Sequence, residues 1–302
     1  MTTANTLSSA FKRTNYMDLS ANYEAAYQWF ESFGFNVAVT RLRKYKACID
    51  ELAGHYNNGT LNTATFQRDF DQQVISLSEA TEIMRIHNGL ANLYACELRD
   101  KLKLVLSGKY GRPLPSDFDP GRDIAFELLL ASRCHHAGLK IEIGKQADLV
   151  ILYNGIEMFV ECKRLKSGAK VRKRIKHAVK QLHKRYKSAK APKAARGILA
   201  LSITDLVNPE QSLMLGTVPE DVGKKVSRHV DAFIDKYRGL WQGAQDSRTI
   251  GAFIELSTPS VIESENLLTT YHQVGMNNAC AIDTIDYSIL TGFASKLAEQ
   301  QL

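Results

Sequence analysis

Two short apolar runs separated by Asn154-Gly155 form the clearest pattern along the chain. The runs cover residues 149–153 and 156–160 and are apolar at every position except Glu157. An Asn-Gly pair between such runs favours a two-residue β-turn. The pattern therefore predicts a β-hairpin in which Tyr153 pairs with Ile156 and, counting outward, Leu149 pairs with Val160.

The same register brings Asp148 directly opposite Glu161 at the open end of the hairpin. Side chains alternate between the two faces of a strand, so Lys163 joins both carboxylates on one face while Cys162 points to the other. Opposed residues have Cβ atoms about 4.5–5.5 Å apart, and like charges at that distance destabilise a sheet. A divalent cation between the carboxylates, with the Lys163 ammonium beside it, would offset this repulsion.

Apolar residues cover the face of the hairpin opposite the carboxylates and much of the carboxylate face. The opposite face carries Leu149, Ile151, Tyr153, Ile156, Met158, Val160 and Cys162, and the carboxylate face carries Val150, Leu152 and Phe159. A sheet that is covered on both sides indicates an α/β or α+β arrangement. The alternative is a surface hairpin whose Glu161 and Lys163 are solvated.

Apolar residues before residue 110 recur at helical spacing. Tyr23, Ala26, Tyr27, Phe30 and Phe33 form one such stripe. The pattern predicts helices at about 18–33, 37–56, 65–76 and 78–106. Ser76 and Glu79 have the spacing of a capping box at the start of the last of these helices. Residues 1–110 are therefore predicted to form a helical domain, or a helical extension of the rest of the chain.

Prolines first appear at Pro113, Pro115 and Pro120, and this cluster indicates a boundary. Asp119-Pro120 is typical of a helix start, and the helix is predicted to run to about Ala137. Further helices are predicted at about 169–188 and 219–243 and near the C-terminus. Further strands are predicted at 197–204, 251–256 and about 279–282. Residues 111–302 are therefore predicted to form one α/β domain.

Asp148 followed by Glu161-Cys162-Lys163 resembles the PD-(D/E)XK nuclease superfamily, although Ala147 replaces the usual proline before the first acid. The resemblance implies a restriction-endonuclease-like core, which is a central mixed sheet flanked by helices. It also implies that Mg²⁺ or Mn²⁺ binds to Asp148, Glu161 and the backbone carbonyl of Cys162. Lys163 would orient or help deprotonate a metal-bound water, or stabilise charge in the transition state.

The resemblance also suggests two accessory site residues, Glu127 and Gln181. Glu127 lies on the helix that starts at Pro120, where the family often has a metal-assisting glutamate. Gln181 and Tyr186 lie on or beside the apolar stripe of the 169–188 helix, where some nuclease branches carry a glutamine and a tyrosine. Their spacing here is one residue longer than in that motif. A solvated glutamate, and ordinary packing or surface roles for Gln181 and Tyr186, are the alternatives.

The basic residues are concentrated directly after this motif. From Lys163 to Arg196 the chain has 15 Lys and Arg and no Asp or Glu, and this formal charge of +15 leaves −8 for the rest of a chain whose total is +7. Such a stretch is typical of proteins that bind phosphate backbones. The predicted nucleic-acid-binding residues are Lys166, Lys170, Arg172, Lys173, Arg174, Lys176, Lys180 and Lys184. A solvated helix face or an acidic protein partner are the alternatives.

Composition sets limits on the class of protein. The 302 residues are 44% hydrophobic, yet no apolar run is long enough to span a bilayer and residues 1–15 lack the apolar stretch of a signal peptide. A cytoplasmic protein without a membrane partner is therefore expected. The five cysteines have no C-x-x-C spacing, which argues against a disulfide framework or a zinc ribbon.

Together these features predict a metal-dependent nuclease that hydrolyses phosphodiester bonds, with DNA favoured over RNA. A catalytically silent nucleic-acid-binding or assembly protein with the same fold is the alternative. A protein-interaction scaffold whose basic stretch meets an acidic partner is a third reading. The N-terminal helical region would form a homodimer, select the substrate or bind a partner protein, and the sequence does not discriminate among these roles.

Overall fold

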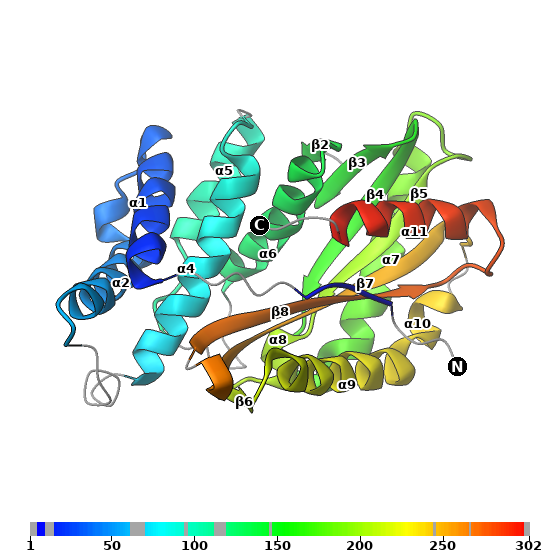
Figure 1. Cartoon of the computed structure of the whole chain (residues 1–302). Coiled ribbons are helices and arrows are strands. Elements are labelled where there is room, and N and C mark those ends of the chain that lie inside the picture. The colour runs from blue at the N-terminus through cyan, green and yellow to red at the C-terminus, as the bar shows by residue number, and fades with distance from the viewer. Residues whose placement is uncertain are drawn as a thin grey trace.

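The computed structural model describes residues 5–9, 15–60, 70–93, 96–111, 119–144, 147–243, 246–265 and 267–298. It is an α/β protein in which a helical region precedes a mixed β-sheet that carries helices on both faces (Figure 1). Within these residues, no helix combines the length and the apolar character needed to cross a lipid bilayer.

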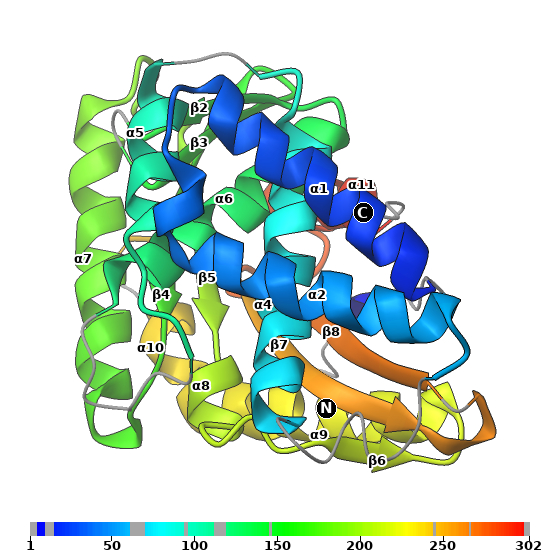
Figure 2. The same ribbon diagram turned by 90° about the vertical axis from the view of Figure 1, so that its left-hand side faces the viewer.

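The helical region contains the helices α1 (Tyr16–Ser32), α2 (Arg41–Asn57), α4 (Phe70–Leu90) and α5 (Cys96–Leu106), with a 3-10 turn η1 (Val37–Val39) between the first two. The predicted apolar stripe of α1 is buried. α2 begins four residues later than predicted, because the Thr40 hydroxyl accepts a hydrogen bond from the Leu42 N–H and caps the helix there. Figure 2 shows α1 and α2 side by side on the outside of α4.

The predicted helix start at Ser76–Glu79 is wrong. Both residues lie inside α4, which runs without interruption from Phe70 to Leu90. The Glu79 carboxylate accepts hydrogen bonds from the buried side chains of Arg41 and Arg122, so it does not cap a helix. The chain turns instead at residues 91–93, and residues 61–69 of the predicted 65–76 helix lie outside the described part.

The sheet has eight strands in the described part of the chain, in the order β1-β8-β7-β5-β4-β3-β2, with β6 paired to β7. β2, β3 and β4 are antiparallel, whereas β4, β5 and β7 are parallel. The strands are β1 (Asn5–Ser9), β2 (Lys140–Ile143), β3 (Leu149–Tyr153), β4 (Ile156–Arg164), β5 (Arg196–Ser202), β6 (Met214–Gly216), β7 (Thr249–Ile262) and β8 (Leu267–Asn278).

The predicted strand at 279–282 is wrong, because these residues form a bend and a turn after β8. The pattern missed the strands β1, β2, β6 and β8. The longest of them, β8, forms an antiparallel hairpin with β7. The strand predicted at 251–256 is the first half of β7. β7 reaches Ile262 since its partners β6 and β8 continue the ladder to that point.

Helices cover both faces of the sheet. They are α6 (Pro120–His136), α7 (Val171–Ser188), α8 (Thr204–Val207), α9 (Pro219–Tyr237), α10 (Gly239–Gln242) and α11 (Ile285–Ala298), with 3-10 turns η2 (Gly168–Lys170) and η3 (Glu263–Glu265). Asp119 caps α6 as predicted, since its Oδ1 accepts from the Arg122 N–H at 3.2 Å. α7 is the crossover between the parallel strands β4 and β5.

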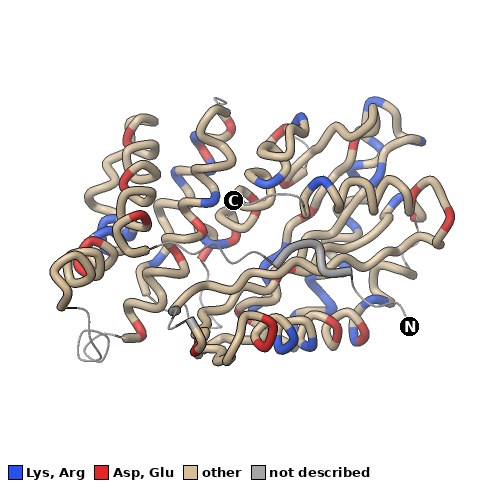
Figure 3. Tube along the Cα trace, viewed as in Figure 1, with Lys and Arg blue, Asp and Glu red and all other residues tan. Residues whose placement is uncertain are grey.

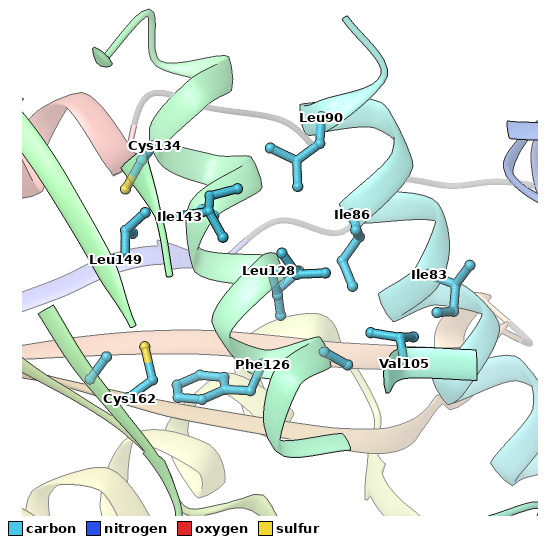
Figure 4. Close-up of a cluster of buried hydrophobic side chains, with 14 of the residues drawn as sticks. Ile83, Ile86, Leu90, Val105, Phe126, Leu128, Cys134, Ile143, Leu149 and Cys162 are labelled. Atoms are coloured by element: carbon cyan, nitrogen blue, oxygen red, sulfur yellow. The ribbon is translucent and has the colours of Figure 1, made fainter. Parts of the chain in front are cut away.

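Two hydrophobic cores lie on the two faces. The core beneath α7, α9 and α10 includes Val150, Phe159 and Leu199. The core on the other face contains Leu149 and Cys162 from the strands together with residues of α6, α11 and the helical region. Figure 4 shows it running from Ile83 and Leu90 on α4 past Leu128 on α6 to the strands. The helical region is therefore packed on the sheet through a shared core.

Candidate functional site

The hairpin that carries the motif has the predicted register. Tyr153 pairs with Ile156 and Leu149 pairs with Val160, with the intervening pairs in step. Asn154 and Gly155 both adopt positive φ angles, 50° and 78°, as a type I′ turn requires. The local sequence thus determines which residues lie at the open end of the hairpin.

Asp148, Glu161 and Lys163 meet at that open end. The Lys163 Nζ lies 3.3 Å from Asp148 Oδ2 and 3.4 Å from Glu161 Oε2. Asp148 Oδ2 also accepts a hydrogen bond of 2.8 Å from the Cys162 N–H, which anchors the carboxylate to β4. The Cys162 side chain lies in the core on the opposite face, as the alternation predicted. The Glu161 side chain has no exposed surface.

The backbone carbonyl of Cys162 completes a set of three oxygens around Lys163, because Nζ donates to it at 2.8 Å. These oxygens are the ones that the family resemblance assigns to a metal ion. Two carboxylates and a carbonyl are hard oxygen donors that suit Mg²⁺, which takes one or two carboxylates and keeps several waters at about 2.0–2.1 Å. A cation bound there would take the place that the Lys163 ammonium holds.

Arg185 is a site residue that the sequence reasoning missed. It reaches from α7, and its Nε lies 3.3 Å from Glu161 Oε1, on the side of the carboxylate away from Lys163. The Arg185 side chain is 36% exposed, so it connects a buried carboxylate with solvent. Its only sequence signal is its place beside Tyr186 on the buried stripe, and the surrounding run of basic residues hides that signal.

Glu127 pairs with Lys101 of α5, another residue that the sequence reasoning missed. The Lys101 Nζ contacts Glu127 Oε2, and both side chains are largely buried. Burial raises the pKa of Glu127 to about 7, the charge of Asp148 adds to this effect, and Lys101 opposes it. In the described part of the chain, no three His, Cys, Asp or Glu side chains are grouped to hold a metal, so a ligand role for Glu127 stays a prediction.

The site raises the pKa of both Glu161 and Lys163, which favours the neutral form of the carboxyl and the charged form of the amine. Burial raises the pKa of Glu161, and the nearby charge of Asp148 raises it further, while Lys163 and Arg185 oppose the rise. Burial alone would lower the pKa of Lys163, but the carboxylates of Asp148 and Glu161 outweigh burial and raise it. Lys163 is therefore a firmly charged ammonium in this arrangement.

Tyr186 packs in the hydrophobic core, which was the alternative to a role in the site. Its ring is fully buried and its hydroxyl lies 2.9 Å from Thr249 Oγ1. The Gln181 Oε1 is buried and has no hydrogen-bond partner within the described residues. No hydrogen bond joins Gln181 to Asp148, Glu161 or Lys163 in that part of the structure, and its catalytic role stays a prediction.

Some of the predicted nucleic-acid-binding residues are exposed, and others contact neighbouring protein groups. Lys166 is largely buried and lies 3.4 Å from Asp123 Oδ1, and the half-buried Arg174 donates to the Arg164 carbonyl at 2.8 Å. The exposed group comprises Lys170, Arg172, Lys173, Lys176, Lys180 and Lys184. Charges of both signs are scattered through the helical region (Figure 3), whereas α7 has no acidic residue.

Three comparisons with known proteins accompany this geometry. A scan against protein-family models, a search of curated proteins and a search of solved structures each found no match to the chain. The functional assignment therefore depends on the residues and contacts described above.

Proposed function

We propose that this protein is a metal-dependent nuclease with a restriction-endonuclease-like core. The observation that carries the proposal is the convergence of Asp148 Oδ2, Glu161 Oε2 and the Cys162 carbonyl on one point, which the Lys163 ammonium now holds. Hard oxygen ligands beside a charged lysine are the groups that phosphodiester hydrolysis with Mg²⁺ or Mn²⁺ requires.

The order and pairing of the elements support the proposed core. Helix α6 is followed by the antiparallel strands β2, β3 and β4, then by the crossover helix α7 and the parallel strand β5. This is the order of helix, hairpin, helix and strand that the resemblance implies. The buried Glu161 on a central strand argues against the alternative of a solvated surface hairpin.

The residues of the site would have the following roles. Asp148, Glu161 and the Cys162 carbonyl would hold the metal ion, which when bound would supply an acidic water and neutralise charge on the phosphate. Lys163 stays close to the attacked phosphate, where its ammonium orients the water and stabilises the additional negative charge. The exposed basic residues of α7 attract the phosphate backbone without reading bases.

Cleavage of labelled single- and double-stranded DNA and RNA tests the proposal. We expect wild-type protein to cleave at least one substrate with Mg²⁺ or Mn²⁺ and none in EDTA. Asp148→Asn, Glu161→Gln and Lys163→Met should each lower the rate by about 10²–10⁴-fold, the range for loss of one acid–base or charge-stabilising group.

Glu157→Gln is the matched control, because Glu157 lies on the same strand and its carboxylate accepts from the Lys190 N–H at 2.8 Å, away from the site. This variant should retain the wild-type rate. Cleavage that persists in EDTA, or in folded Glu161→Gln protein, would contradict the metal-dependent mechanism.

A catalytically silent nucleic-acid-binding protein is the second candidate. It is favoured by the pairing of Glu127 and Glu161 with Lys101 and Arg185, which leaves these carboxylates with partners in the absence of a metal. Folded wild-type protein that binds DNA in a salt-dependent way but cuts no substrate with either metal would establish this reading.

A further inference from the structure

The carboxylates of the site are matched one for one by cationic side chains from three different elements. The cations are Lys101 on α5, Lys163 on β4 and Arg185 on α7, and the carboxylates are those of Glu127, Asp148 and Glu161. The formal charges of the six groups cancel. A site arranged in this way is electrostatically satisfied before any metal ion enters.

A divalent cation would disturb this balance. Two unit charges 4 Å apart interact by about 4 kcal/mol at an effective dielectric constant near 20, so a doubly charged ion cannot be added without rearranging the neighbouring cations. After metal binding the six groups and the ion would carry a formal charge of +2. Two backbone phosphates carry a formal charge of −2, so they would neutralise this excess.

Lys101 and Arg185 are the cations best placed to move. Arg185 makes a single contact with Glu161, is 36% exposed, and shares α7 with the exposed basic residues. Lys101 likewise contacts one oxygen of one carboxylate, from a helix outside the sheet. Lys163 differs, because its ammonium contacts all three proposed metal-ligand oxygens. It must withdraw from them when a metal binds, but as the proposed catalytic group it stays beside the attacked phosphate.

We propose that Lys101 and Arg185 are exchangeable counter-ions, which leave Glu127 and Glu161 when a divalent cation binds and then bind backbone phosphates. The proposal rests on the proposed metal-dependent function and assigns a role to the helical region, which supplies Lys101. It makes metal binding and nucleic-acid binding cooperative, since each removes the charge that opposes the other.

The proposal is tested by measuring binding rather than cleavage. Free Mn²⁺ is measured by electron paramagnetic resonance at pH 8, with and without a phosphorothioate duplex DNA or a phosphorothioate single-stranded RNA of 12 residues. For wild-type protein we expect the Mn²⁺ dissociation constant to fall at least about fivefold when one of these oligonucleotides is present, the lower end of typical coupling between sites.

Lys101→Met and Arg185→Met should give opposite effects on the two ligands. Each removes a positive charge next to the metal position, so we expect Mn²⁺ alone to bind about three- to tenfold more tightly than to wild-type protein. The same variants should bind the oligonucleotide more weakly in the presence of Mn²⁺ and should show a smaller coupling. A merely structural role would not tighten metal binding.

Lys103→Met and Lys236→Met are matched controls, since both residues are exposed lysines on α5 and α9. They should reproduce the wild-type constants. Unchanged or weaker Mn²⁺ binding by Lys101→Met and Arg185→Met, with wild-type coupling, would overturn the exchange. If wild-type protein cleaves with metal yet shows no coupling, the exchange fails while the nuclease stands; if it binds no Mn²⁺, both fail.

Discussion

Glu127 shows how strongly a single position in this site depends on its surroundings. On sequence it is a glutamate between Phe126 and Leu128 on an amphipathic helix. In the structure it is largely buried, contacts Lys101, and has its pKa raised to about 7, first by burial and then by the charge of Asp148. The folded protein therefore holds a proton there that the unfolded chain releases near pH 4.5.

This difference predicts a pH dependence of stability. Between pH 4.5 and 7 the folded state binds more protons than the unfolded state, so the free energy of unfolding falls as pH rises through this window. A rise of this size corresponds to at most about 3 kcal/mol. Urea unfolding in EDTA should show that wild-type protein loses about 1–3 kcal/mol more between pH 5 and pH 8 than Glu127→Gln does.

Glu142→Gln serves as the control for this measurement, because Glu142 is an exposed glutamate on β2 outside the site. Its profile should parallel that of the wild type. Equal profiles for wild-type protein and Glu127→Gln would mean that the carboxyl of Glu127 titrates near its ordinary pKa.

At the scale of elements, α7 combines two tasks on two faces. Val171, Ile175, Ala178, Leu182 and Tyr186 are buried at helical spacing against β4 and β5, and this face holds the helix in place. The other face presents exposed lysines and arginines, and Arg185 lies at the border between the two. A helix without acidic residues is held by packing rather than by ion pairs along its surface.

The exposed face predicts a measurable salt dependence. Lys176→Ala with Lys180→Ala removes two exposed cations one turn apart, so the slope of log binding constant against log salt should become shallower by about 2 for duplex DNA. Filter binding or fluorescence anisotropy between 50 and 200 mM salt measures the slope. Lys296→Ala, on α11 across the sheet, should leave it unchanged; a shift as large as that of the double variant would place the DNA elsewhere.

At the scale of the whole molecule, a buried ionic network ties the helical region to the sheet-bearing part. Glu79 of α4 accepts from Arg41 of α2 at 2.9 Å and from Arg122 of α6 at 2.7 Å. Burial would raise the pKa of Glu79, but Arg122 and Arg41 outweigh it and hold the pKa at about 2. The network is therefore ionised at all working pH values.

Breaking this network is predicted to destabilise the whole molecule. Glu79→Ala removes the carboxylate that Arg41 and Arg122 share and leaves Arg122 paired with Asp119. Breaking a buried ion pair in this way costs about 3–5 kcal/mol. Because the helical region and the sheet share one core, we expect circular dichroism and tryptophan fluorescence to report a single transition at lower urea. Glu31→Ala, at an exposed position of α1, should have little effect. Separate transitions would show two independently stable parts.

The sequence by itself determined the hairpin, its register and the face on which Asp148, Glu161 and Lys163 lie. It also determined the cap of α6 and the two faces of α7. These features depend on turn chemistry, strand alternation and helical spacing within about 20 residues. The local order of side chains determines such short-range interactions. Gln181 and Glu127 were placed on the right helices, but their contacts were not predictable.

Only the tertiary structure decided which distant groups complete the site. Lys101 reaches Glu127 and Arg185 reaches Glu161 because α5 and α7 pack against α6 and β4 respectively. The same packing keeps Glu79 inside α4 instead of at a cap, and it pairs β8 with β7 and β1. Such contacts join residues far apart in the chain, and they follow from how buried faces fit together, which no local pattern of residues specifies.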